Sequence, residues 1–214
     1  MIIDHFFMVI PAILAKTKKE FEYKAKSVMS YCDLIQIDVM DGIFVPNKTW
    51  ADIDVIKHMH LPVEFEVHLM VREPEVVIED WAKAGAKRII FHIEATRNPK
   101  ECIKIIKRFK RQAGIAINPK TSVARIKDFL KKIDYVLIMG VDPGFSGQKF
   151  QPSILNKIKR LKKLAPNIKI GVDGGINKKN AKDIKKAGAD FLCVASSIFK
   201  SKNLAKAVDV LNNI

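Results

Sequence analysis

The chain has 214 residues, of which 38 are Lys or Arg and 23 are Asp or Glu, so its formal net charge is +15. This length fits one domain better than two, and a composition of 48% hydrophobic and 29% charged residues excludes an intrinsically disordered chain. No apolar run approaches the roughly 20 residues that cross a bilayer. The first ten residues lack a basic start and lead into a strand-like segment, so we expect no signal peptide, no membrane partner and a cytoplasmic location.

The excess of basic residues raises the question of a nucleic-acid partner. Thirty-one of the basic residues are Lys and seven are Arg, whereas recognition of phosphates and bases favours the bidentate guanidinium. Lysines spread over many helices mainly keep a surface solvated, so we do not expect nucleic-acid binding. Cys32, Cys102 and Cys193 are too far apart for a CxxC metal or redox motif and are expected to be reduced.

Short apolar segments alternate with amphipathic helical segments along the whole chain. The pattern predicts strands at 8–14, 34–40, 63–69, 88–94, 114–118, 135–141, 168–173 and 191–196. It predicts helices at 17–31, 50–59, 74–84, 98–112, 121–132, 152–165, 177–187 and 203–212. Prolines at 74, 99 and 152 suit a first helical turn, and Asn98, Ser122 and Asn203 suit helix N-caps.

Eight strand–helix pairs in this length, with no long linker, predict a single α/β domain over residues 1–214, a (β/α)8 TIM barrel. The nearly continuous apolar strands agree with a parallel sheet covered by helices. A doubly wound open sheet is the alternative. It usually opens with a glycine-rich loop after the first strand, and this chain has none there.

Polar side chains occupy the C-terminal ends of several predicted strands, which is where a barrel of this kind carries its chemistry. Gln36, Asp38 and Met40 share one face of the second strand because alternate residues point the same way. If such faces look inward, Asp38, His68 and Asp173 converge and form a plausible site for a divalent cation. Taken singly, Asp38 equally fits a carboxylate that accepts backbone hydrogen bonds, and His68 fits a core histidine.

Turns rich in glycine and serine follow the last three predicted strands. They are Pro143-Gly144-Phe145-Ser146-Gly147-Gln148, Gly174-Gly175 and Ser196-Ser197. Such turns expose backbone N–H groups to an anion, and the loops after strands seven and eight are the usual phosphate site of a barrel. They also fit tight turns that require positive φ, but their presence in three adjacent units favours phosphate binding.

The motifs along this chain resemble the signatures of ribulose-phosphate 3-epimerases. They are Asp38-Val39-Met40-Asp41-Gly42, Phe44-Val45-Pro46-Asn47, Val67-His68-Leu69-Met70, Asn118-Pro119, the segment 141–148 and Val172-Asp173-Gly174-Gly175-Ile176. The resemblance spans essentially the whole chain. It implies a barrel of the ribulose-phosphate binding type, an enzyme of pentose-phosphate metabolism that interconverts D-ribulose 5-phosphate and D-xylulose 5-phosphate. It also implies a small-molecule sugar phosphate as partner and a homo-oligomer.

The resemblance implies a role for each matching residue. Asp38 and Asp173 match the acceptor and the donor of the C3 proton, and with His68 they match ligands of a divalent metal ion. Three methionines, which by composition alone would be barrel core, match side chains that pack against the enediolate: Met40, Met70 and Met139. The implied substrate and phosphate contacts are His68, Gly144, Phe145, Ser146, Gly147, Gly174, Gly175, Ser196 and Ser197.

Three positions depart from the family pattern. Gln36 stands where the family has a metal-binding His, Ala12 where it has a substrate-contacting Ser, and Ser196 where Gly is common. An amide oxygen can serve as a metal ligand, but it is a harder and weaker donor than imidazole. With Gln36 in the ligand set, zinc affinity should fall and Mn²⁺ or Mg²⁺ should become more acceptable. The sequence does not decide among Zn, Mn, Fe and Mg.

Three functions remain open from the sequence. The first is an epimerase with a changed metal site, which the retained Asp38 and Asp173 favour. The second is a related barrel enzyme that acts on another sugar phosphate, such as a hexulose phosphate, or that catalyses aldol or decarboxylation chemistry. The third is a catalytically silent binder of sugar phosphates or nucleic acid, and the two retained carboxylates argue against it.

Overall fold

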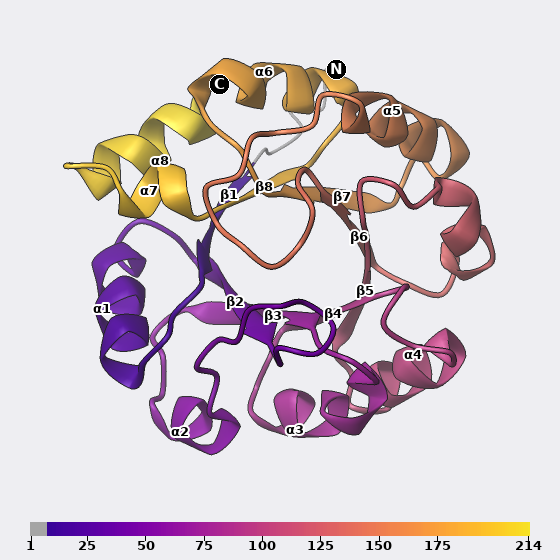
Figure 1. Ribbon diagram of the computed structural model, residues 1–214, viewed down its shortest axis with the longest axis horizontal. Coiled ribbons are helices and arrows are strands. Elements are labelled where there is room, and N and C mark those ends of the chain that lie inside the picture. The colour runs from indigo at the N-terminus through magenta and orange to yellow at the C-terminus, as the bar shows by residue number, and fades with distance from the viewer. Residues whose placement is uncertain (1–7) are drawn as a thin grey trace.

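The structure is a computed structural model that describes residues 8–214, and within this range eight parallel strands close into a barrel (Figure 1). The strands are β1 (Met8–Ile13), β2 (Leu34–Met40), β3 (Glu64–Met70), β4 (Arg88–His92), β5 (Gln112–Ile117), β6 (Tyr135–Met139), β7 (Lys169–Asp173) and β8 (Phe191–Val194). Each strand pairs with the next one along the chain, and β8 pairs with β1 to close the ring. The predicted (β/α)8 barrel is confirmed.

Helices surround the barrel and connect its strands (Figure 1). They are α1 (Lys18–Val28), α2 (Ile53–His58), α3 (Ile78–Lys83), α4 (Pro99–Arg108), α5 (Ile154–Leu164), α6 (Lys178–Ala187), α7 (Ser196–Phe199) and α8 (Leu204–Asn212). Two segments are 3-10 helices, η1 (Pro74–Val76) and η2 (Val123–Phe129). The short α7 begins at Ser196, within the segment that the sequence pattern assigned to a strand.

The helix predicted at 121–132 is present as the shorter 3-10 helix η2. Its apolar residues Val123, Ile126 and Phe129 recur every third position, which matches the three residues per turn of a 3-10 helix. Ser122 accepts a hydrogen bond from the amide of Ala124, so the expected cap is present. Asn98 makes no side-chain cap bond.

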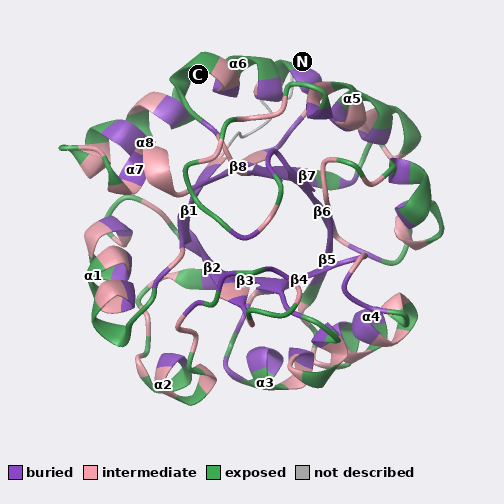
Figure 2. Ribbon diagram, in the orientation of Figure 1, coloured by how far each residue is buried: buried purple, intermediate pink, exposed green. Residues whose placement is uncertain are grey.

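Strand side chains alternate between two cores, and the strands are therefore buried on both faces (Figure 2). The outward residues pack against the helices, where Phe21 of α1 and Trp81 of α3 are almost fully buried. The inward residues fill the barrel, among them Ile10, Ile90 and Leu137. Apolar side chains on both faces of the sheet are therefore removed from water, one set against the helices and the other inside the barrel.

The floor of the barrel contains a buried ion pair. The Arg88 guanidinium donates from Nε and Nη2 to Glu66 Oε2 at 2.8 and 2.7 Å. Its central carbon lies 3.7 Å from the centroid of the Tyr135 ring, which adds a cation–π contact. Both charged residues are nearly inaccessible to solvent. Each charge therefore needs the other to offset the free energy lost when it is removed from water.

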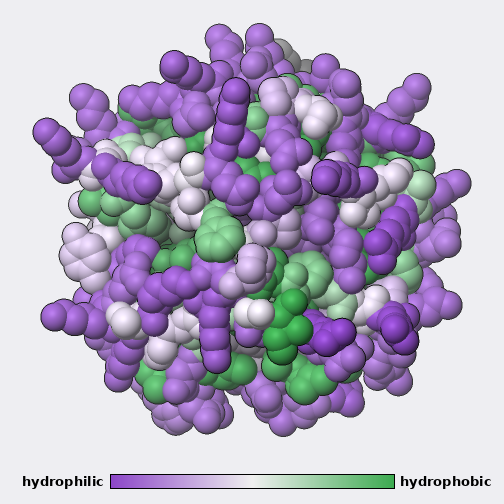
Figure 3. Space-filling view, viewed as in Figure 1, coloured by the Kyte–Doolittle hydropathy of each residue, from purple (hydrophilic) through white to green (hydrophobic). Residues whose placement is uncertain are grey.

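Hydrophilic side chains cover most of the face in Figure 3 and project around its rim. None of the helices in residues 8–214 is long and apolar enough to cross a membrane. The three cysteines are free thiols, as expected.

Candidate active site

A cleft opens at the C-terminal ends of the strands. The loop between β6 and α5 reaches across the mouth of the barrel above it (Figure 1). The cleft is lined by carboxylates, thioethers and the glycine-rich turns, including Asp38, Met40, Met70, Met139, Gly144, Phe145, Ser146, Gly147, Asp173, Gly174, Gly175 and Ser196. The barrel therefore brings most of the residues selected from the sequence to one place.

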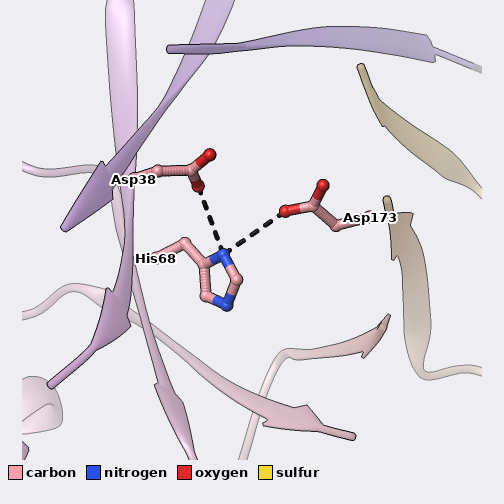
Figure 4. A group of neighbouring side chains, drawn as sticks. All are labelled: Asp38, His68 and Asp173. Carbon is pink, nitrogen blue, oxygen red and sulfur yellow. Dashed lines mark hydrogen bonds and ion pairs between the residues drawn. The ribbon is translucent and has the colours of Figure 1, made fainter. Parts of the chain in front are cut away.

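Asp38, His68 and Asp173 meet inside the barrel (Figure 4), and the two aspartates line the cleft. Asp38 and His68 are paired across the β2–β3 register, and Asp173 ends β7 on the other side of the ring. His68 Nδ1 lies 3.2 Å from Asp38 Oδ1 and 3.3 Å from Asp173 Oδ2. All three side chains are buried or nearly so. One imidazole nitrogen therefore contacts both carboxylates.

The Gln36 side chain also contacts both carboxylates. Its Nε2 donates to Asp38 Oδ1 at 2.8 Å and to Asp173 Oδ2 at 2.7 Å. The other atom of this amide, Oε1, is buried and has no hydrogen-bond partner. Since a buried unpaired acceptor is destabilising, this half-satisfied amide indicates a site arranged for something more than its present contacts.

The buried charges shift one another's protonation. Burial raises the pKa of Asp38, and the neighbouring Asp173 carboxylate raises it further. Burial alone would lower the pKa of His68, but its hydrogen bonds to Asp173 and Asp38 outweigh this effect and raise the pKa to about 9. In the metal-free protein His68 is therefore protonated at neutral pH and provides the positive charge between the carboxylates.

The residues fit a divalent cation. Two carboxylates and one imidazole offer ligand atoms that all lie within 4.8 Å of one another. With a neutral imidazole, the two negative charges balance a divalent ion. A half-turn of the Gln36 amide exchanges its two atoms and would direct the unpartnered Oε1 at the carboxylates, an arrangement that only a cation between them makes favourable.

His92 and Glu94, to which the sequence assigned no role, lie directly behind His68. His68 Nε2 is 2.9 Å from His92 Nε2, and His92 Nδ1 is 3.3 Å from Glu94 Oε2. Both histidines are completely buried, with their rings stacked at a centroid distance of 5.0 Å. The signal in the sequence was their place at the end of the predicted strand 88–94, although β4 ends at His92 and Glu94 lies in the turn that follows.

The glycines of the late turns are explained by backbone geometry. Gly174 and Gly175 have φ values of +103° and +70°. A Cβ on Gly174 would lie 2.4 Å from Val141 Cγ2, and one on Gly175 would lie 2.6 Å from the Phe150 backbone nitrogen. The tight-turn interpretation is thus correct for both, and an argument for phosphate binding has to rest on their position beside the cleft.

Ser197 does not line the cleft, unlike its neighbour Ser196. Its hydroxyl donates to the Ile176 carbonyl, so its visible contact joins α7 to the turn after β7. Lys200, which the sequence could not distinguish among 31 lysines, does lie near the glycine-rich loop. Its Nζ is 3.8 Å from the position that a Cβ on Gly147 would occupy. An ammonium group therefore stands at this end of the cleft.

Asn47 connects two of the loops around the cleft. This buried side chain donates from Nδ2 to the Gly144 carbonyl at 2.9 Å. Its Oδ1 accepts from Lys16 Nζ and from the Lys48 amide. The loop after β2 thereby supports the glycine-rich loop after β6.

The fold and the cleft at its strand ends define the class of protein, a (β/α)8 barrel enzyme. Comparison with known proteins identifies the family. The model for the ribulose-phosphate 3-epimerase family matches residues 8–199. Curated relatives include the ribulose-phosphate 3-epimerase of Chlamydia trachomatis, 38% identical over 95% of this chain and 91% of that protein. The enzyme of that name from Escherichia coli K12 is 32% identical over 97% and 95%.

This chain belongs to the ribulose-phosphate 3-epimerase family and is an isomerase. Among solved structures, that of KGPDC from Streptococcus mutans has a TM-score of 0.77 and 16% sequence identity, covering 97% of this chain and 96% of that one. At this identity the likeness concerns the fold alone.

Proposed function

We propose that this protein interconverts D-ribulose 5-phosphate and D-xylulose 5-phosphate by proton transfer at C3 between substrate and two aspartates, Asp38 and Asp173. The observation that carries the proposal is the arrangement of these carboxylates, which come from β2 and β7 and flank one cleft (Figure 4). Inversion of a carbon requires a proton to leave one face and another to arrive on the opposite face. Two carboxylates on distant strands meet that requirement.

The two aspartates take opposite roles in each direction. From D-ribulose 5-phosphate, Asp38 accepts the C3 proton, and Asp173 donates a proton to the other face of the enediolate. The reverse reaction exchanges these roles. The burial that raises the pKa of Asp38 strengthens it as a base, because a carboxylate that is poorly solvated binds a proton more firmly.

The remaining lining of the cleft suits the intermediate and the phosphate. Met40, Met70 and Met139 provide apolar thioether surface that offers no competing proton donor. We assign the phosphate to the glycine-rich turns and Ser196, where backbone N–H groups are available to an anion. The ammonium of Lys200 beside Gly147 adds a favourable charge.

We assign a divalent metal ion to Asp38, His68 and Asp173, with Gln36 Oε1 as the fourth protein ligand. When bound, the ion supplies positive charge that stabilises the enediolate oxygens. The donor set does not select among Zn, Mn, Fe and Mg, although the harder amide oxygen of Gln36 makes Mn²⁺ and Mg²⁺ more acceptable than an all-imidazole site would.

The test uses purified protein with Mn²⁺ or Zn²⁺ and measures formation of D-xylulose 5-phosphate. Asp38→Asn and Asp173→Asn should each abolish epimerisation, whereas the control Asp183→Asn, an exposed residue of α6, should not. Reactions in D₂O separate the two roles. Asp173→Asn should still exchange the C3 proton of D-ribulose 5-phosphate, and Asp38→Asn should not. Absence of turnover with every divalent metal, in folded protein that binds the substrate, would contradict the proposal.

A further inference from the structure

A continuous line of contacting side chains runs from Asp38 and Asp173 through His68 and His92 to Glu94. It begins at His68 Nδ1, passes from His68 Nε2 to His92 Nε2 at 2.9 Å, and continues from His92 Nδ1 to Glu94 Oε2 at 3.3 Å. His68 and His92 have no exposed surface. Water therefore does not reach their ring nitrogens, and each nitrogen depends on its protein partners.

Glu94 is held in place at the end of this line. Its Oε1 accepts a hydrogen bond from the Asn118 amide at 2.9 Å and another from the Thr121 hydroxyl. Burial would raise the pKa of Glu94, but the hydrogen bonds from His92, Thr121 and Asn118 outweigh it and lower the pKa to about 2. The group is thus an ionised carboxylate at neutral pH, and a carboxylate only accepts.

The direction of every hydrogen bond follows from that charge. His92 must carry a proton on Nδ1 to donate to Glu94, and with that single proton its Nε2 holds a lone pair. The facing nitrogen, His68 Nε2, must then carry the single proton that the 2.9 Å contact allows. When a cation takes the place of the Nδ1 proton, His68 keeps its proton on Nε2 and presents the Nδ1 lone pair to a cation held by Asp38 and Asp173.

We propose that Glu94 and His92 are positioning residues that fix the tautomer of His68, so that its Nδ1 is the atom offered to a cation held by the two aspartates. The inference rests on the proposed metal site. Histidines that bind metals commonly donate their second ring nitrogen to a carboxylate or carbonyl. Here a second imidazole relays that orientation from a carboxylate too distant to contact His68 itself.

The test compares Glu94→Gln with Glu73→Gln, a control that removes an equal charge from the same rim but contacts neither histidine. Affinity for Mn²⁺ and Zn²⁺ is measured by competition with a chelator, and folding is checked by thermal unfolding without metal. Glu94→Gln should weaken metal binding by about 10–100-fold, because the amide accepts or donates and no longer enforces one tautomer. Glu73→Gln should leave the affinity unchanged.

Nitrogen-15 NMR of histidine-labelled, unaltered protein provides a second readout that needs no variant. The metal-free protein should show His92 protonated on Nδ1 alone, and the zinc-loaded protein should show His68 bound through Nδ1 with a proton on Nε2. A His92 protonated on Nε2 alone, or unchanged metal affinity in folded Glu94→Gln, would overturn the inference. If the unaltered protein binds no metal, the proposed metal site is wrong. The His92 tautomer still shows which nitrogen donates in each hydrogen bond between Glu94, His92 and His68.

Discussion

The side-chain amide of Gln36, on β2, lies 2.7 Å from the Asp173 carboxylate, on β7, and so connects two strands that are not neighbours in the ring. The same nitrogen donates to Asp38. In the metal-free protein this N–H reduces the repulsion between the two carboxylates. The cost is an Oε1 atom without a partner. Gln36 therefore stabilises the site in one orientation of its amide and offers a ligand oxygen in the other.

Gln36→His should raise the affinity for Zn²⁺ by about tenfold or more, which corresponds to about 1.4 kcal/mol, because imidazole is the better zinc donor. Chelator competition measures the change. Gln36→Leu is the matched control and should lower the affinity, since it removes the donor and keeps similar volume. Equal zinc affinity in all three proteins would exclude position 36 from the ligand set.

Asn47→Ala should raise the KM for D-ribulose 5-phosphate more than it changes kcat. The substitution removes the hydrogen bond that holds the Gly144 carbonyl, worth about 0.5–1.5 kcal/mol or about 2–10-fold in KM. Steady-state kinetics separate the two constants, and hydrogen exchange of residues 142–148 should become faster. Asn213→Ala, at the far end of α8, serves as the control. A fall in kcat alone would contradict a role in substrate binding.

Removal of one member of the Glu66–Arg88 pair should destabilise the barrel strongly. Glu66→Leu leaves the Arg88 guanidinium buried without its partner, and the expected loss of unfolding free energy is about 3–5 kcal/mol. The double variant Glu66→Leu with Arg88→Met should recover most of that loss. Urea unfolding of the three proteins measures the differences. A double variant less stable than Glu66→Leu would show that the pair is not the source of the effect.

The stability contributed by Glu94 should depend on pH in metal-free protein. Its pKa of about 2 in the folded state lies below the ordinary value of 4.5, so the contribution is complete above pH 4.5 and is lost as the pH falls toward 2. Glu94→Gln should therefore differ from the parent most at pH 5–7, by at most roughly 3 kcal/mol. Chemical unfolding at several pH values tests this, and a difference that grows below pH 4.5 has the wrong sign.

Much of the fold could be predicted because local patterns encode it. The apolar strands and their spacing were enough for eight βα units, and their boundaries differ from those observed mainly at the ends. The segment 121–132 was predicted as a helix, and the structure forms a 3-10 helix over its central part. The spacing of three between Val123, Ile126 and Phe129 was the information that distinguished a 3-10 helix.

The sequence by itself determined which residues share a face of a strand, since a period of two places Gln36 with Asp38 and Met40 on one side. It also carried the motifs that show the family. Only the tertiary structure decided what these residues contact. Gln36 and Asp173 are 137 positions apart in the chain, and their contact exists because the closed ring brings β2 and β7 to opposite sides of one narrow interior. The pairing of β3 with β4 stacked His92 on His68, and the turn after β7 holds the Ser197 hydroxyl through the Ile176 carbonyl. Strand periodicity is a local property of the chain, whereas contacts across a barrel depend on its closure, and that is a property of all eight strands together.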